Sequence, residues 1–377
     1  MHSQERSKDV EAQLVMLDCG ALDPLCAVWH PAGDSVIVMG KEVDHTSRRV
    51  HCALDGGSVS GTIDQLSPEL APNTLVFSPD GRFAAWAQVR HHPTDGATRF
   101  CEIYLHEMGG ETTRIFAARN FWLEAAMGSL VFRGDGQCLA WGELGERAIM
   151  LYDIPSKVLR TIHAVMPNPS LWETGAFLAF SPCGRYLVQG TGFDNGDLPA
   201  DPNQCFMRGA VYQFDLRSSA AGPQLIGLLT HRVEHLVYDP RGVFILAGSY
   251  VGAVTHYAHP PQSLVALKAN HFRDVAFSMP IFREGWAKVW RVACHPTKTW
   301  VAIGTSFGEV AVWNYTPRAD GCPPTPLIFS VGTYSVTSLS FSPNGDHLLC
   351  ASHLYGSGAY SPFGSPVCVL AMASFME

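Results

Sequence analysis

Three segments of the chain place a tryptophan within two positions of a glutamate, and these residue types at this spacing could do chemistry. Each tryptophan lies 12 or 14 residues before a turn that recurs along the chain. Tryptophan and arginine supply a large share of the energy of protein interfaces, because they bury large areas and bond directionally. The pattern predicts a recognition patch, which contains Trp122, Trp172 and Trp286 together with Arg119, Arg232 and Arg283.

Two other interpretations of the same segments stay open. In the first, each tryptophan folds back and covers the edge of its own sheet. In the second, the neighbouring carboxylates Glu124, Glu173 and Glu284 point inward, hold a divalent cation and polarise a carbonyl oxygen. The asparagine partners that such cation sites usually have are not evident in the sequence.

The elements that position these segments are indicated by a short phrase that recurs seven times. Each copy joins an apolar run to a turn that is rich in proline and glycine. Aligned on the glycine, or on Lys298 in the sixth copy, the copies are separated by 48, 55, 48, 58, 56 and 47 residues. Such a period is typical of repeat architectures. The copies cover residues 28–33, 77–81, 132–136, 180–184, 238–242, 294–298 and 341–345.

Each phrase predicts a β-hairpin, because proline presets φ at the first corner of a turn and glycine accepts the positive φ of the last. A second apolar run follows each turn, as residues 300–304 follow the sixth copy. A third run ends in an aromatic residue or leucine followed by Asp or Asn, as at Trp313-Asn314. Fourth strands are predicted near residues 113–117, 158–165, 224–230 and 326–331. Four strands in each of seven repeats predict an all-β protein.

Residues 304–314, Gly-Thr-Ser-Phe-Gly-Glu-Val-Ala-Val-Trp-Asn, resemble the strand, turn and strand that mark WD-repeat proteins. The chain is similar over nearly its whole length to a degenerate member of the WD-repeat (WD40-type) β-propeller family, since it contains no Trp-Asp dipeptide. The resemblance implies a seven-bladed β-propeller of four-stranded antiparallel blades. The blades are expected to start near residues 25, 74, 128, 176, 234, 288 and 336.

The two ends of the chain predict how the ring closes. The seventh repeat stops after its third strand, at residues 367–372, and residues 13–17 have the apolar character of a strand. We expect these segments to pair, so that the N-terminal strand completes the last blade and leaves no open sheet edge. One propeller is thus expected over residues 12–377, after a disordered N-terminus at residues 1–11.

The composition limits the kinds of partner and the cellular location that are expected. The net charge is −8 and no run of Lys or Arg exceeds two, which disfavours electrostatic binding to nucleic acid or to anionic membranes. The 11 cysteines lack Cys-x-x-Cys spacing, so they are interpreted as small apolar residues in a reducing compartment. No apolar segment resembles a signal peptide or a membrane span, and a cytoplasmic or nuclear location is expected.

By resemblance, the loop face of a WD-repeat propeller holds a peptide or a protein subunit. We therefore expect a non-catalytic interaction scaffold without cofactors or metals, acting as a monomer within a multiprotein complex. Trp122, Trp172, Arg232, Arg283 and Trp286 are its expected partner-binding residues. The alternative is a divalent-cation-dependent propeller hydrolase of the lactonase type, for which Glu124, Glu173 and Glu284 would be the ligands.

Overall fold

In the computed structural model most of the described residues form antiparallel β-strands, which fall into two compact units. Unit 1 comprises Met1–Leu75 and Trp290–Glu377, and unit 2 comprises Val76–Val289. The described residues are 14–17, 19, 23–41, 47–54, 75–91, 99–119, 130–143, 148–163, 172–194, 208–218, 222–229, 233–249, 264–268, 275–279, 289–314, 326–353 and 367–372. Residues 1–11, which are expected to be a disordered N-terminus, lie outside these ranges. No helix within these ranges is long and apolar enough to cross a membrane.

Unit 2 contains four sheets of four strands each. Sheet β5-β6-β7-β8 is built from Leu75–Phe77, Phe83–His91, Arg99–Glu107 and Thr112–Arg119. Sheet β9-β10-β11-β12 follows with Val131–Phe132, Cys138–Glu143, Ala148–Asp153 and Val158–His163. Sheet β13-β14-β15-β16 consists of Trp172–Phe180, Tyr186–Asp194, Arg208–Asp215 and Gln224–Leu229. Sheet β17-β18-β19-β20 consists of Val233–Tyr238, Phe244–Ser249, Leu264–Lys268 and Val275–Met279.

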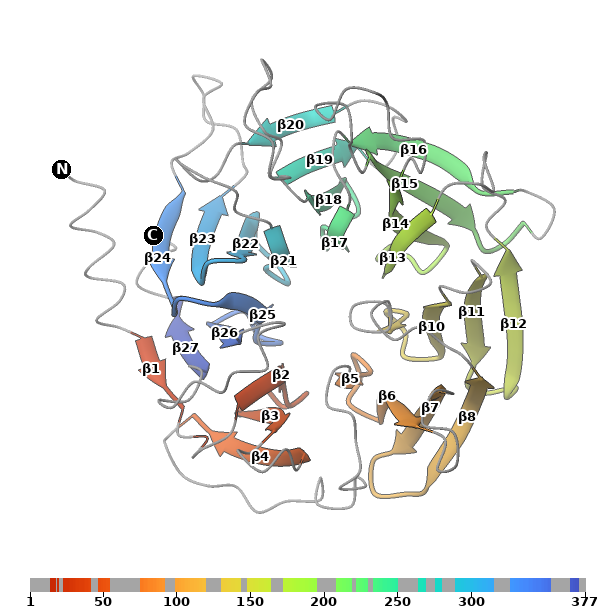
Figure 1. Cartoon of the computed structure of the whole chain (residues 1–377), viewed down its shortest axis with the longest axis horizontal. Helices are drawn as coiled ribbons and strands as arrows, with labels where there is room; N and C mark the ends of the chain where they lie inside the picture. The colour runs from red at the N-terminus through yellow and green to blue at the C-terminus, as the bar shows by residue number, and fades with distance from the viewer. Residues whose placement is uncertain are drawn as a thin grey trace. The chain divides into compact units, whose positions relative to one another are not determined.

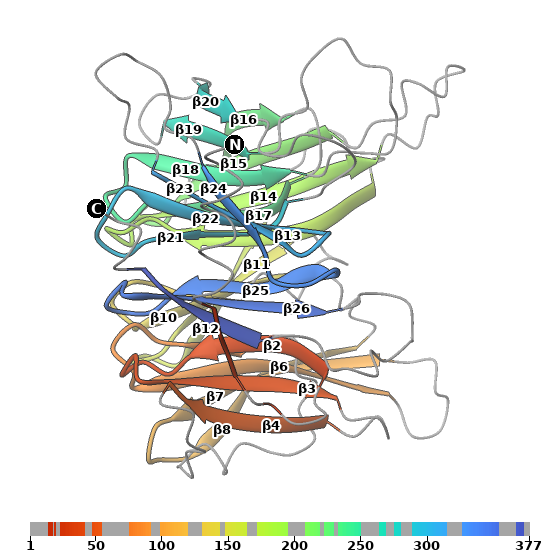
Figure 2. The same ribbon diagram turned by 90° about the vertical axis from the view of Figure 1, so that its left-hand side faces the viewer.

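Unit 1 contains three sheets. Strands β2, β3 and β4, at Asp23–Trp29, Ser35–Lys41 and Ser47–Ala53, lie side by side in Figure 2. Sheet β21-β22-β23-β24 consists of Val289–Cys294, Trp300–Thr305, Glu309–Asn314 and Leu327–Ser330. In the last sheet, β25 (Ser335–Phe341), β26 (His347–His353) and β27 (Val367–Ala371) are joined by β1 (Leu14–Met16) from the other end of the chain.

The predicted count of seven four-stranded blades is not confirmed. Within the described residues six sheets have four strands, whereas sheet β2-β3-β4 has three. The residues that follow β4, 55–74, lie outside the described ranges. Six complete blades are therefore what the described strands form, and closure of a ring stays a prediction.

The expected pairing between the ends of the chain is observed. Strand β1 runs antiparallel to β27, with Leu14, Val15 and Met16 opposite Leu370, Val369 and Cys368. The N–H of Leu17 extends the ladder by donating to the carbonyl oxygen of Val367 at 2.8 Å. Figure 1 shows β1 beside β27 at the outer edge of this sheet. The N-terminal segment thus supplies the fourth strand of the last sheet.

The recurring phrase forms the predicted tight turns between first and second strands. In three turns a serine hydroxyl accepts a hydrogen bond from the N–H five residues later, at 2.9 Å for Ser78, 2.9 Å for Ser181 and 3.0 Å for Ser342. Glycines with φ between +66° and +80° end six of the turns. A left-handed backbone conformation favours glycine, which explains why glycine recurs at the end of the phrase. These glycines are Gly33, Gly81, Gly136, Gly184, Gly242 and Gly345.

The sixth turn has neither the serine nor the glycine of the recurring phrase, and carries His295 and Lys298 in their places. His295 stands at the serine position, and its Nδ1 accepts hydrogen bonds from the N–H groups of Thr297 and Lys298 at 3.1 and 3.0 Å. Its ring also packs edge-on against Phe341 in the next sheet, with centroids 5.2 Å apart. Burial, reinforced by the nearby charge of Lys298, lowers the pKa of His295, and burial also lowers the pKa of His106.

Acidification is expected to destabilise the protein through these two histidines. Both side chains are buried, and their pKa values in the folded state lie below the ordinary value of 6.5, so the unfolded chain binds more protons. The stability they contribute is present above pH 6.5 and is lost as the pH falls below it. Urea denaturation at pH 7.5 and pH 5.5 measures the loss. The variant His295→Ser keeps an acceptor in the turn and is expected to flatten the pH dependence; an unchanged slope would contradict the assignment to His295.

Apolar clusters lie between neighbouring sheets of each unit. In unit 1, Leu348 and Cys350 of β26 face Val310 and Val312 of β23 in one cluster. On the other face of the last sheet, Leu349 and Val369 pack with Trp29, Val36 and Val38 of the first sheet. The second and third strands contribute most of the fully buried residues, as expected for strands covered on both faces.

Strand β20 accounts for part of the apolar segment at residues 271–286, which lies between the fifth and sixth recurring turns. The structure uses Val275–Met279 as the fourth strand of its sheet, paired with β19 from Leu264↔Met279 to Leu267↔Val275. The apolar character of the segment therefore serves sheet formation at these five residues.

Candidate functional site

Most of the predicted partner-binding residues lie outside the described residues. These are Trp122, Arg232, Arg283 and Trp286, and the same holds for Glu124 and Glu284. Arg119 ends strand β8, opposite Phe100. The predicted recognition patch thus stays a prediction.

Trp172 corrects the expected loop position. It opens strand β13 opposite Asp194, and Glu173 pairs with Phe193. The second strand continues to Asp194, and the ladder passes a bulge between Thr174 and Phe177, so both strands are longer than the apolar runs predict. Trp172 nevertheless lies at the end of its sheet that carries the connection between second and third strands, here called the loop end. The opposite end, which carries the recurring turns, is the turn end.

An exposed aromatic residue lies at the loop end of sheet β21-β22-β23-β24. The hairpin between β22 and β23 consists of Ser306, Phe307 and Gly308, and Gly304 and Val310 form the last strand pair before it. The Oγ1 of the fully buried Thr305 accepts hydrogen bonds from the N–H groups of Phe307 at 3.3 Å and Glu309 at 3.1 Å. These bonds satisfy the hairpin backbone and fix its conformation.

The segment that leads into the next sheet holds the hairpin from one side. The N–H of Val331 donates to the carbonyl oxygen of Gly308 at 2.8 Å, and the Ser335 hydroxyl donates to that of Ser306 at 3.3 Å. Gly308 has φ of +76°, and a Cβ atom there would collide with the carbonyl oxygen of Gly332. The hairpin is therefore locked against its neighbour in the same unit.

The side chain of Phe307 remains 52% exposed despite this support. Thr333 is also exposed, and Tyr334 is half-buried. We call residues 305–309 and 332–335 the hairpin patch. Burial raises the pKa of the Glu309 carboxyl within it. A large apolar side chain on a rigid backbone loses little entropy on binding, which suits it to anchor a partner.

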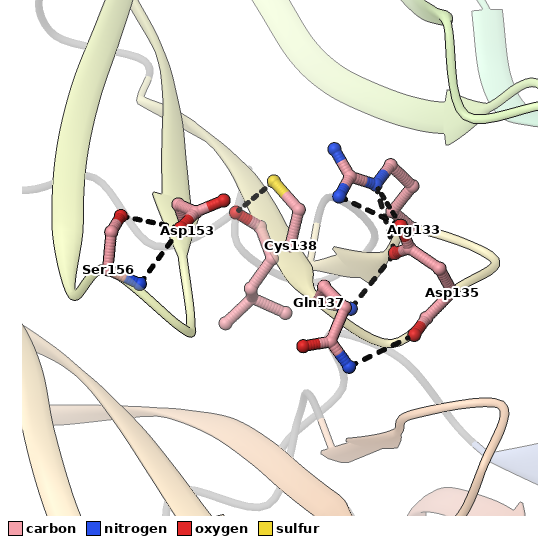
Figure 3. A network of polar contacts seen from close by, with 7 residues as sticks. Arg133, Asp135, Gln137, Cys138, Asp153 and Ser156 are labelled. Atoms are coloured by element: carbon pink, nitrogen blue, oxygen red, sulfur yellow. Dashed lines mark hydrogen bonds and ion pairs between the residues drawn. The ribbon is translucent and has the colours of Figure 1, made fainter.

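The turn end carries polar networks of a different kind. Figure 3 shows one, in which Arg133 Nε donates to both carboxylate oxygens of Asp135 at 2.9 and 3.0 Å. Asp135 also accepts from the N–H of Gln137 at 2.9 Å, and Asp153 accepts from the N–H of Ser156 at 3.0 Å. The bond from Arg133 is the main cause that lowers the pKa of Asp135. These side chains satisfy the backbone and one another, so the network stabilises the turns.

The described residues contain no group of three or more His, Cys, Asp or Glu that could hold a metal ion. In the same network, Cys138 donates to the carbonyl oxygen of Leu139 at 3.9 Å, and burial raises its pKa to about 11, so it is protonated at neutral pH. Of the three carboxylates in the cation-site alternative, Glu173 alone falls in a described strand, and its side chain is not described.

Comparisons with known proteins agree with this architecture. A family model described as "WD domain, G-beta repeat" matches residues 327–353, which span β24 to β26. No curated protein matches the chain.

Solved structures resemble the chain over nearly its whole length. The structure of U3-55K is similar with a TM-score of 0.61 and 13% identity, over 96% of this chain and 98% of that one. The crystal structure of RRP9 WD40 repeats gives 0.61 and 12% over the same shares. The Kuenenia stuttgartiensis hydrazine synthase gives 0.57 and 16%, over 95% of this chain and 97% of that one.

The fold is thus an all-β propeller. One repeat of the chain matches the WD-repeat family model, and the solved WD40 structures share its fold, in keeping with the sequence resemblance to WD-repeat β-propellers. Because one of the similar structures is a hydrazine synthase, the fold alone does not separate a scaffold from an enzyme.

Proposed function

We propose that the protein is a non-catalytic interaction scaffold that binds a peptide or protein subunit at the loop ends of its sheets. The observation that carries this proposal is Phe307, whose side chain is 52% exposed on a hairpin held by Thr305, Val331 and Ser335. The WD40 repeat structures similar to this chain are consistent with such a role.

The wider function follows the sequence expectations. The scaffold acts as a monomer within a multiprotein complex in the cytoplasm or nucleus, without a cofactor and without direct contact to nucleic acid or membrane. Trp122, Trp172, Arg232, Arg283 and Trp286 are the proposed partner-binding residues of unit 2, and the hairpin patch is that of unit 1. The cation-dependent hydrolase gains no support from the described residues.

Substitution of Phe307 tests the proposal. Phe307→Ala is expected to reduce capture of a stable partner by about tenfold or more, because truncating an anchor costs about 1.4–2 kcal/mol or more. The melting temperature is expected to change little, since the side chain is largely outside the core. The measurement is quantitative affinity purification of the tagged protein from its native cell, with a photo-crosslinking residue at position 307 in a parallel sample.

Val243→Ala is the matched control. Val243 is 45% exposed and lies in the turn between β17 and β18, at the turn end of its sheet. The Val243→Ala variant is expected to capture every partner that the unmodified protein captures. Equal capture by Phe307→Ala and the unmodified protein would remove the hairpin patch from the binding surface. Recovery of the unmodified protein alone, with no crosslinked partner, would contradict the scaffold function itself.

A further inference from the structure

Two cysteines from different parts of the chain meet beside the N-terminal strand. Cys19 follows β1, Cys52 belongs to β4, and their Sγ atoms are 4.0 Å apart although 33 residues separate them in sequence. Cys52 is 6% exposed and Cys19 is partly buried, in a cluster with Leu17, Val367 and Val369. Neither forms a disulfide in this structure.

We propose that Cys19 and Cys52 form a reversible disulfide that clamps the N-terminal strand in place. The sulfur atoms of a disulfide are about 2.05 Å apart, so the two thiols must approach by about 2 Å. Cys19 lies in the short connection between β1 and β2, and not in either strand, so its side chain can turn without breaking a strand ladder.

The difference in exposure assigns the roles. With a small disulfide such as oxidised glutathione, the more accessible Cys19 thiolate attacks one sulfur, forms a mixed disulfide and releases one glutathione thiolate. The Cys52 thiolate then attacks Cys19 Sγ and releases the second. One disulfide bond breaks and one forms in the complete exchange. The two cysteine thiols lose two protons and two electrons, and the oxidant is reduced to two thiols.

Other cysteines among the described residues differ from this pair in exposure or in having a second thiol nearby. Cys350 and Cys368 are directly opposite each other on β26 and β27, but both are fully buried, so a dissolved oxidant cannot reach them in the folded protein. Cys183 is exposed, and the Ser181 hydroxyl lowers its pKa, so it is expected to take up glutathione by itself. Cys19 and Cys52 combine an accessible thiol with a second thiol at 4.0 Å.

The clamp would act on a weakly held element. Strand β1 is three residues long, and its Val15 and Met16 side chains are 52% and 57% exposed. Short edge strands open locally more readily than core strands do. A bond to Cys52 ties the chain just after β1 to the first sheet, so it restricts both the opening of β1 and the unfolded chain. Oxidation would therefore keep the edge of β27 covered.

The test treats the full-length protein with oxidised or reduced glutathione, with Cys183→Ser as the background variant. We expect a peptide pair linked through Cys19 and Cys52 by non-reducing mass spectrometry. In the oxidised sample we expect hydrogen exchange of the Leu17 N–H to slow by about tenfold or more, and the melting temperature to rise by about 2–4 °C. Reduction by dithiothreitol is expected to reverse all three effects.

Two single substitutions keep the proposal falsifiable. Cys19→Ser changes a partly exposed residue, whereas Cys52→Ser changes a buried one that the fold itself could require. Both are expected to lose the oxidised stabilisation. Glutathione retained on Cys19 without a link to Cys52 would overturn the proposal. A link that leaves the exchange of Leu17 unchanged would equally overturn the clamp.

Discussion

Gly308→Ala is expected to lower the free energy of unfolding by about 2–5 kcal/mol. Two costs add at this position. An alanine at φ of +76° is strained by about 1–2 kcal/mol. Its Cβ atom would also collide with the carbonyl oxygen of Gly332 and lie 2.9 Å from that of Tyr334, and both oxygens belong to backbone that cannot rotate away. Such overpacking costs about 1–3 kcal/mol.

Gly109→Ala separates the two costs. Gly109 has φ of +78°, nearly the same as Gly308, but an added Cβ would meet nothing within 4 Å. It is therefore expected to lose about 1–2 kcal/mol, from backbone strain alone. Urea denaturation of both variants measures the difference. Equal losses of unfolding free energy would show that residues 332–335 move aside to accommodate the added Cβ atom. The hairpin that carries Phe307 would then not be rigid.

The repeat architecture could be predicted from sequence because its turns are chemically specific. Two features recur at nearly constant spacing: a glycine with left-handed backbone, and in three turns a serine whose hydroxyl accepts from the N–H five residues later. The local sequence therefore indicates each hairpin. The pairing of β1 with β27 could be predicted from a missing strand at one end and an unused apolar run at the other. The lengths of the strands were harder to predict from the sequence. Trp172 was expected in a loop, whereas β13 begins there.

The hairpin patch was missed for a physical reason. Its sequence, Thr-Ser-Phe-Gly-Glu, was interpreted only as part of a strand, turn and strand. Phenylalanine usually indicates core. The backbone on either side of Phe307 is held by Val331 and Ser335, which lie more than 20 residues further along the chain. The available local signal was Phe307 directly before a hairpin glycine, where side chains commonly point to solvent.

Asp239→Ala is expected to lower the free energy of unfolding by about 2–4 kcal/mol. Asp239 is fully buried at the serine position of its turn, where its Oδ1 accepts from the N–H of Val243 at 2.7 Å. Its Oδ2 accepts from Arg241 Nε at 3.0 Å. Alanine would leave the partly buried N–H of Val243 without its acceptor, which costs about 1–3 kcal/mol, and would release the arginine.

Asp239→Ser is the matched control, because serine occupies the same position in the turns of Ser78, Ser181 and Ser342. A hydroxyl there can accept from the N–H of Phe244, to which Asp239 Oδ1 already lies at 3.4 Å. The serine variant is therefore expected to lose less than about 1 kcal/mol, measured by urea denaturation beside the alanine variant. Equal destabilisation by both substitutions would show that the turn depends on the charge facing Arg241. A small loss for serine alone means that an acceptor at this position suffices in this turn, as in the turns that carry Ser or His there.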